Sequence, residues 1–135
     1  FDGAEYDYYT TTKGILEKVK THAGDVDFEV QPELLSLFSN RDFGRYAGEK
    51  GEMNVCFISN NDITGGNSGS AMFNARGELL GLAFDGNWEA MSSDILYEPK
   101  MQRCIGVDVR YILFMIEKYG KAGNLIRELK IVSGK

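Results

Sequence analysis

Short runs of β-prone apolar residues occupy the middle of the chain and predict a strand followed by a β-hairpin. Met53–Ile58 forms the first run, and Ala71–Phe73 and Glu78–Phe84 form the second and third. Between the last two runs, Asn74–Gly77 has turn chemistry, because Gly77 can adopt the positive φ that a hairpin exit often requires. We therefore expect the second and third runs to pair as a hairpin.

Helical spacing of apolar residues occurs in three other segments. Pro32–Phe38 begins with proline, which suits the first position of a helix, and continues with apolar residues at helical intervals. Arg110–Tyr119 and Ala122–Leu129 carry apolar residues at i, i+3 and i+4, and Gly120 separates them. The sequence therefore predicts one short early helix and two helices that close the chain.

The remaining segments carry weaker patterns. Arg103–Val109 predicts a further strand, with Ile105, Val107 and Val109 on one face. The first thirty residues look extended and turn-rich, and the apolar positions of Ile15–Val19 fit either a strand or one helical turn. The whole pattern predicts a mainly β fold with helices last.

Composition narrows the possible functions. The chain of 135 residues is long enough for one domain, residues 1–135, with a real hydrophobic core. A total of 20 acidic and 15 basic residues gives a net charge of -5 without a basic cluster, which argues against a nucleic-acid partner. The longest apolar stretch, Tyr111–Ile116, is too short to insert across a membrane.

The cysteines and the histidine do not form a metal motif. Cys56 and Cys104 lack Cys-x-x-Cys spacing, and the chain has one histidine, so we expect neither a metal nor another cofactor. One disulfide in an oxidising compartment and two buried free thiols both fit the sequence.

The run Asn61–Ser70 carries the most specific chemistry in the chain. Ser68 lies between glycines, after polar residues and before an apolar strand, as a nucleophile on a tight turn does. Gly66-Asn67-Ser68-Gly69 is similar to the Gly-Asp-Ser-Gly of chymotrypsin-type serine peptidases, with asparagine in place of aspartate. In those enzymes the N–H groups of the serine and of the glycine two before it form the oxyanion hole, which here would be Ser68 and Gly66. A plain surface turn is the alternative interpretation.

Further motifs make the resemblance specific. Asn60–Ser70 is followed by Gly81–Glu89, then by Met91–Asp94 and Val107–Tyr111, in an order that closely resembles the bacterial dipeptidyl-peptidase 7 and 11 group, serine peptidase family 46. The likeness is strong over Thr64–Leu129 and looser before it. The chain resembles the C-terminal part of these enzymes and is closer to the dipeptidyl-peptidase 7 branch.

The resemblance implies an exopeptidase that removes dipeptides from free N-termini. It implies a chymotrypsin-like double barrel, of which this chain would be the second, C-terminal β-barrel, closed by one or two C-terminal helices. The first barrel and an inserted helical domain would lie outside this sequence. Carried over by position, Ser68 would be the nucleophile, Gly66 and Ser68 the oxyanion donors, and Asp85 an anchor for the substrate ammonium. Gly86 matches the base of the specificity pocket, where acid-specific relatives carry arginine and hydrophobic-specific ones glycine.

Physical chemistry supports the roles of Asp85 and Gly86. An acidic side chain in a narrow pocket needs a cation, which glycine does not supply. Glycine instead leaves volume for an apolar side chain, whose burial contributes roughly 2 kcal/mol. A carboxylate at Asp85 favours a free ammonium and gains nothing from a blocked N-terminus. We therefore expect an apolar second substrate residue, and a shift toward acidic residues in Gly86→Arg; a plain turn over Asp85–Asn87 is the alternative.

The sequence does not contain an evident base for the nucleophile. His22, the one histidine, lies in the polar stretch Thr21–Asp25, upstream of Ser68 within the same predicted barrel. In chymotrypsin-like enzymes the histidine and its aspartate come from the first barrel. We therefore expect His22 to be a surface residue, the base to lie in sequence outside this chain, and the isolated chain to be inactive.

Three functions follow as hypotheses. The first is a serine-type dipeptidyl aminopeptidase that acts on peptides with free N-termini, in the periplasm or on the cell surface of a Gram-negative bacterium. The second is a trypsin-like periplasmic endopeptidase, which would gain nothing from Asp85. The third is a non-catalytic peptide-binding barrel, against which the intact Gly65–Gly69 turn argues. The sequence leaves the oligomeric state open, and a homodimer of the longer protein is compatible with it.

Overall fold

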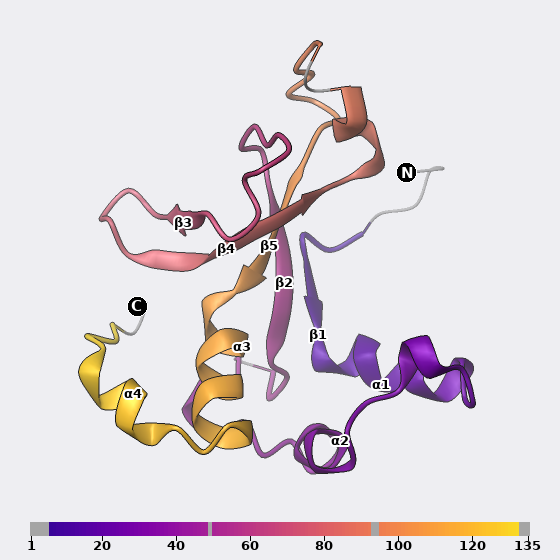
Figure 1. Cartoon of the computed structure of the whole chain (residues 1–135), viewed down its shortest axis with the longest axis vertical. Helices are drawn as coiled ribbons and strands as arrows, with labels where there is room; N and C mark the ends of the chain where they lie inside the picture. The colour runs from indigo at the N-terminus through magenta and orange to yellow at the C-terminus, as the bar shows by residue number, and fades with distance from the viewer. Residues whose placement is uncertain (1–5, 49, 93–94, 133–135) are drawn as a thin grey trace. The chain divides into compact units, whose positions relative to one another are not determined.

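The chain folds into two compact units (Figure 1). The computed structural model describes residues 6–48, 50–92 and 95–132. The sheet unit comprises Phe1–Thr10 and Cys56–Val109, and the helical unit comprises Thr11–Val55 and Arg110–Lys135. Each unit has a hydrophobic cluster of its own. The assignment of residues 1–135 to one domain stays a prediction from the sequence.

A five-stranded sheet forms the sheet unit and contains the predicted strands (Figure 1). Its order is β1-β2-β5-β4-β3, and β2/β5, β5/β4 and β4/β3 pair antiparallel. The strands are β1 (Tyr9–Thr11), β2 (Asn54–Ser59), β3 (Ala71–Phe73), β4 (Leu79–Gly86) and β5 (Cys104–Asp108). The mainly antiparallel sheet and the helices at the C-terminal end confirm the predicted fold class at this level.

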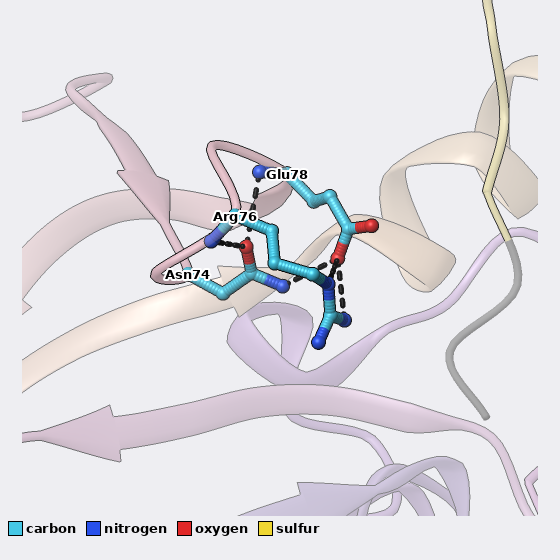
Figure 2. A network of polar contacts seen from close by, with 3 residues as sticks. All are labelled: Asn74, Arg76 and Glu78. Carbon is cyan, nitrogen blue, oxygen red and sulfur yellow. Dashed lines mark hydrogen bonds and ion pairs between the residues drawn. The ribbon is translucent and has the colours of Figure 1, made fainter.

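The turn between β3 and β4 is closed by side chains (Figure 2). Asn74 Oδ1 accepts hydrogen bonds from the backbone N–H of Arg76 at 2.9 Å and of Glu78 at 3.0 Å. Glu78 in turn accepts hydrogen bonds from Arg76 Nε at 2.9 Å and Nη2 at 2.6 Å. Gly77 has φ of 75°, a conformation that favours glycine. The predicted hairpin and the role of Gly77 are both confirmed.

Two glycines, Gly81 and Gly106, let the strands of the sheet unit pack closely. The Phe57 ring lies against Gly106, its cross-strand partner, and against Gly81 on β4. A Cβ added at Gly81 would lie 2.1 Å from the carbonyl oxygen of Val107, and one added at Gly106 would lie 2.5 Å from Met72 Sδ. A side chain at either of these strand positions would therefore force a neighbouring atom to move.

The face of β5 that packs most tightly is not the one that the apolar pattern indicated. Ile105 and Val107 share a face and are only half-buried, whereas Cys104 and Gly106 on the opposite face are buried; Val109, predicted on the first face, instead begins α3 (Val109–Phe114). Cys104 joins the hydrophobic cluster of the sheet unit, whose buried and partly buried members are Met72, Ala83, Cys104, Phe57 and Ile63. Gly106 on this face leaves the space that the Phe57 ring occupies.

We expect Gly81→Ala to lower the free energy of unfolding by about 3 kcal/mol or more, because a backbone oxygen cannot withdraw without breaking the ladder. Gly106→Ala should cost only about 1 kcal/mol, since the flexible Met72 side chain can rotate away. Urea unfolding of the 135-residue chain measures both. Gly14→Ala is the control for an added methyl without a clash, because nothing outside helix α1 (Thr12–Thr21) lies within 4 Å of the added Cβ; it should raise stability by about 1 kcal/mol through helix propensity. Equal losses at Gly81 and Gly106 would contradict the packing argument.

The helical unit contains the predicted helices and one that was not predicted. α2 (Pro32–Ser39) begins with Pro32 as expected. α3 (Val109–Phe114) continues as a π-helical turn over Met115–Tyr119, and α4 (Gly123–Glu128) follows. The two closing helices are thus confirmed.

The prediction of an extended first segment was wrong over α1 (Thr12–Thr21), which is a helix of 10 residues; of the two alternatives for Ile15–Val19, the helical one is observed, in a longer helix. Ile15 and Leu16 pack against a buried aromatic cluster formed by distant parts of the unit, and this contact selects the helix. Lys18 and Lys20 in the last turn also suit the negative end of the helix dipole. The buried members of the cluster are Phe38, Phe43, Tyr46, Met53 and Phe114.

A polar cluster joins the π-helical turn to the segment after α2. Arg45 Nη2 donates to both oxygens of Glu117, at 2.9 and 3.0 Å, and the Tyr46 hydroxyl donates to the same carboxylate. The Tyr46 hydrogen bond, reinforced by Arg45 and opposed by desolvation, lowers the pKa of Glu117. Next along the turn, Lys118 Nζ lies 2.7 Å from Asp42 Oδ1. Consecutive residues of the turn therefore both bind the same segment.

We expect Glu117 to make the chain sensitive to acid. Because the pKa of Glu117 is lower in the folded chain, its stabilising effect is complete above the ordinary carboxyl pKa of about 4.3. The effect is lost as the pH falls below that value and the carboxylate becomes protonated. Glu117→Gln should therefore flatten the dependence of the thermal midpoint on pH between about pH 5 and 3.

The matched control for this prediction is Glu128→Gln, which removes an exposed carboxylate at the end of α4. Thermal unfolding of the two variants and the unsubstituted chain, measured over the same pH series, tests the assignment. Identical slopes for Glu117→Gln and Glu128→Gln would show that the Arg45–Tyr46–Glu117 cluster does not set the acid response.

Candidate functional site

The predicted nucleophile, Ser68, lies in a loop between β2 and β3 whose shape is set by two glycines and by Asn67. Gly66 and Gly69 have φ of 94° and 89°, conformations that side-chain-bearing residues rarely adopt. Asn67 Oδ1 accepts a hydrogen bond from the Thr64 N–H at 2.9 Å, which closes the start of the loop. The glycine and asparagine positions of the motif are therefore explained by the shape of the turn.

Two backbone hydrogen bonds attach the end of this loop to β4. The N–H of Gly69 donates to the Ala83 carbonyl at 2.7 Å, and the N–H of Ala83 donates to the Ser70 carbonyl at 2.9 Å. This pair extends the β3/β4 ladder to residues that precede Ala71, the first residue of β3. Ser68 is thereby placed beside the middle of β4 and remains exposed to solvent.

The hydroxyl of Ser68 has a backbone partner across the loop. Ser68 Oγ donates to the carbonyl oxygen of Phe84 at 3.2 Å. Phe84 is the extra residue of a β-bulge, because Ala83 pairs with Gly106 while Asp85 already pairs with Ile105. A bulge changes the direction of the backbone locally, and here it places the Phe84 carbonyl within reach of Ser68.

The amides predicted for the oxyanion hole are available. Asn67, Gly69 and Ser70 all use their backbone N–H groups within the loop or toward β4. Within the described part of the chain, the N–H groups of Gly66 and Ser68 donate no hydrogen bond. An exposed pair of unused amides beside a serine hydroxyl is what stabilisation of an oxyanion requires.

All four predicted site residues line one cavity of about 260 Å³. Polar groups come from Ser68, Gly66 and Asp85, and Gly86 lines the same cavity. Apolar surface comes from Ile63, Phe84, Ala90 and Met91. The structure thus brings together residues from the serine loop, from the end of β4 and from the 3-10 helix Trp88–Ser92.

The last two residues of β4 have distinct environments. Asp85 is exposed, and its Oδ1 accepts a hydrogen bond from the N–H of Gly86 at 2.8 Å. Its carboxylate forms no ion pair with a lysine or arginine among residues 6–48, 50–92 and 95–132. Asp85 therefore presents a negative charge to the cavity that a cationic ligand group can neutralise.

Sequence reasoning missed Asn87, whose hydrogen bonds hold the segment that follows Gly86. Asn87 Nδ2 donates to the Met101 carbonyl at 2.8 Å and to Glu89 at 2.7 Å, while its Oδ1 accepts from the Arg103 N–H at 2.7 Å. The Asn87 N–H also donates to the Arg103 carbonyl at 2.9 Å. An asparagine after Asp-Gly is a turn signal in the sequence, but its partners Met101 and Arg103 are distant along the chain. Residues 93–94 of the Met91–Asp94 motif lie outside the described residues.

His22 is an exposed residue of the helical unit, as expected. Its ring stacks on Phe28 at 4.0 Å between centroids, and its Nδ1 lies 2.9 Å from Thr21 Oγ1 and 3.1 Å from the Lys18 carbonyl oxygen. Since the chain has one histidine, the sheet unit that holds Ser68 has no imidazole of its own.

The two cysteines are free thiols, which decides between the alternatives that the sequence left open. Burial raises the pKa of both, and Asp108 adds to the effect at Cys56. Neither is therefore activated as a thiolate nucleophile. Among the residues that the structure describes, no group of three or more His, Cys, Asp or Glu side chains is placed to hold a metal ion. None of the helices in those same residues has the length and apolar character to cross a membrane.

Comparison with known proteins covers nearly the whole chain. The family described as Peptidase S46 matches residues 1–131. The chain is 58% identical over 133 residues to Dipeptidyl-peptidase 7 of Porphyromonas endodontalis, and the match covers 98% of this chain and 16% of that protein. It is 56% identical to Dipeptidyl-peptidase 7 of Porphyromonas gingivalis, covering 97% of this chain and 18% of that protein.

A solved structure has the same fold. The crystal structure of Porphyromonas endodontalis DPP11 in complex with the dipeptide Arg-Glu matches with a TM-score of 0.89 and 42% identity, covering 95% of this chain and 18% of that one. This chain therefore spans less than a fifth of the length of the relatives that it matches.

Proposed function

Because the chain belongs to the Peptidase S46 family, we propose that it is the C-terminal part of the catalytic domain of a serine-type dipeptidyl aminopeptidase. One observation carries the proposal. Ser68, the unused amides of Gly66 and Ser68, and the free carboxylate of Asp85 line the same cavity. We assign this chain to the second barrel of a chymotrypsin-like double barrel, whose first barrel lies in sequence outside residues 1–135.

Ser68 acts as the nucleophile in the proposed reaction. Its Oγ attacks the carbonyl carbon of the second substrate residue, and a histidine of the longer protein takes the hydroxyl proton. The N–H groups of Gly66 and Ser68 bind the oxyanion that develops on the carbonyl oxygen. The amine leaves with a proton from the same base, and water then hydrolyses the acyl-enzyme to release the dipeptide and restore the Ser68 hydroxyl.

Asp85 makes the proposed enzyme an exopeptidase. Its carboxylate is oriented by the Gly86 N–H and has no cationic partner among the described residues, so a substrate ammonium can pair with it. A blocked N-terminus would leave the carboxylate without that partner. This favours dipeptide release over the alternative of a trypsin-like endopeptidase. The unused Gly66 and Ser68 amides favour catalysis over a peptide-binding barrel.

The second substrate residue is proposed to be apolar. The cavity beside Ser68 is walled by Ile63, Ala90 and Met91 and has no cation among its lining residues. Burial of a leucine or methionine side chain there contributes roughly 2 kcal/mol, whereas an unpaired carboxylate is disfavoured. The higher identity to the two Dipeptidyl-peptidase 7 proteins than to the DPP11 bound to Arg-Glu supports this preference.

The cellular setting is part of the proposal. We place the longer protein in the periplasm or on the surface of a Gram-negative bacterium, where it would degrade extracellular peptides. The net charge of -5 supports a protein that does not bind nucleic acid. A homodimer of the longer protein is compatible with this function.

The longer protein should hydrolyse dipeptidyl fluorogenic substrates that end in leucine or methionine and have a free N-terminus. N-blocked copies and substrates that end in aspartate or glutamate should be poor. Ser68→Ala should reduce kcat by at least about 10³-fold, because the nucleophile is removed. Asp85→Asn should raise KM for substrates with a free N-terminus, because the ammonium loses its counter-charge. The difference in KM between free and blocked substrates should therefore become smaller.

Equal cleavage of blocked and unblocked substrates by the unsubstituted protein would favour the endopeptidase. Peptide binding without turnover would favour the non-catalytic barrel. Asp62→Asn is the matched control for Asp85→Asn, because Asp62 is exposed in the sheet unit and does not line the cavity.

The isolated 135-residue chain should show no turnover of the same substrates. An unassisted serine hydroxyl is a poor nucleophile at neutral pH, and the sheet unit has no imidazole to activate it. Fluorescence assays with purified chain and with its His22→Ala variant test this. Turnover that disappears in His22→Ala would mean that His22 is the base, contrary to its exposed position in the helical unit.

A further inference from the structure

Gly86 and Ala90 line the cavity and lie so close together that a side chain on Gly86 would meet the methyl group of Ala90. A Cβ placed on Gly86 would lie 2.8 Å from Ala90 Cβ, which is closer than two carbon atoms can approach without a shift. The same Cβ would lie 3.5 Å from Ile63 Cγ2 and 3.7 Å from the Arg103 carbonyl oxygen, which are ordinary contacts. Among the described residues, Ala90 is therefore the one that lies too close to a Cβ at position 86.

Ala90 is held where it is. It is 9% exposed, and its N–H donates to the Asn87 carbonyl at 2.9 Å. Asn87 is bound in turn to the start of β5 by a reciprocal pair with Arg103, at 2.7 and 2.9 Å, and by its side chain to the Met101 carbonyl. To move Ala90 away from Gly86, the chain would have to give up part of this network. The clash at position 86 is therefore costly to relieve by a backbone shift.

We propose that Ala90 is a second specificity-determining residue, which acts with Gly86 as a pair that has room for only one Cβ. This inference rests on the proposed function, because it assigns the cavity to the second substrate residue. With glycine at position 86, the methyl group of Ala90 forms the apolar floor on which the substrate side chain ends. Any other residue at position 86 fits only when position 90 is glycine.

A double-mutant cycle in the longer protein tests the pair. The Gly86→Ala variant should lose at least about tenfold in kcat/KM for the leucine and methionine substrates, because the added methyl overpacks the wall. The Gly86→Ala/Ala90→Gly variant carries one Cβ again and should recover most of that loss. Gly86→Ala/Ala75→Gly is the matched control, because Ala75 is exposed in the β3–β4 turn and does not line the cavity. It should recover nothing.

The same pair should govern a change of specificity. Gly86→Arg alone introduces a cation together with the clash, so its gain on glutamate substrates should be small. Gly86→Arg/Ala90→Gly removes the clash and should cleave glutamate substrates at least about tenfold better than Gly86→Arg. Equal activity of the two variants on glutamate would overturn the pairing.

Thermal unfolding of the same variants tests the contact without relying on turnover. Gly86→Ala should lower the thermal midpoint, and adding Ala90→Gly to that variant should restore the midpoint. Ala90→Gly alone, in the otherwise unsubstituted protein, should not raise the midpoint. Additive effects on both the midpoint and kcat/KM would overturn the inference. If the midpoints couple but the unsubstituted protein cleaves none of the substrates, the contact stands and the proposed function, with the specificity role that rests on it, is overturned.

Discussion

The candidate site depends on the two backbone hydrogen bonds between the serine loop and β4. Gly69 and Ser70 pair with Ala83 at 2.7 and 2.9 Å, which fixes the loop against the strand one residue before its bulge. The bulge then presents the Phe84 carbonyl to Ser68 and turns the end of the strand, with Asp85, toward the same cavity. Without this pairing, the hydroxyl, the amides and the carboxylate would not share one solvent-accessible space.

The backbone geometry and packing of the sheet unit depend on its glycines as well as on its larger side chains. Gly66 and Gly69 give the loop its positive φ values, while Gly81 and Gly106 allow strands to approach a backbone oxygen and a neighbouring side chain. Gly86 belongs to the second kind, because Ala90 occupies the space next to it. Close approach at positions without a Cβ thus supports the fold and also shapes the cavity beside Ser68.

The helical unit is stabilised differently. Its aromatic cluster is bordered by ion pairs and hydrogen bonds that join the π-helical turn to the segment after α2, through Glu117 to Arg45 and Tyr46 and through Lys118 to Asp42. These charged contacts are more exposed than the glycine packing of the sheet unit. Acid is therefore expected to weaken the helical unit through Glu117 and the β3–β4 turn through Glu78, because hydrogen bonds lower the pKa of both carboxylates. The strand packing of the sheet unit depends on steric fit at its glycines.

The sequence by itself determined the elements whose signals are local. The β3–β4 hairpin follows from Asn74–Gly77, α2 from its initial proline, and the closing helices from apolar spacing. The motif around Ser68 and the family resemblance over Gly81–Glu89 identified four residues that line the cavity, Gly66, Ser68, Asp85 and Gly86, although their roles remain proposals. Only the tertiary structure decided α1, the bulge at Phe84 and the contact between Gly86 and Ala90. Helix α1 is selected by packing against distant aromatic residues, and the bulge at Phe84 results from pairing with β5. The contact between Gly86 and Ala90 depends on Asn87, which binds residues far along the chain. Such interactions leave no periodic pattern in the sequence, because each depends on which distant segments meet.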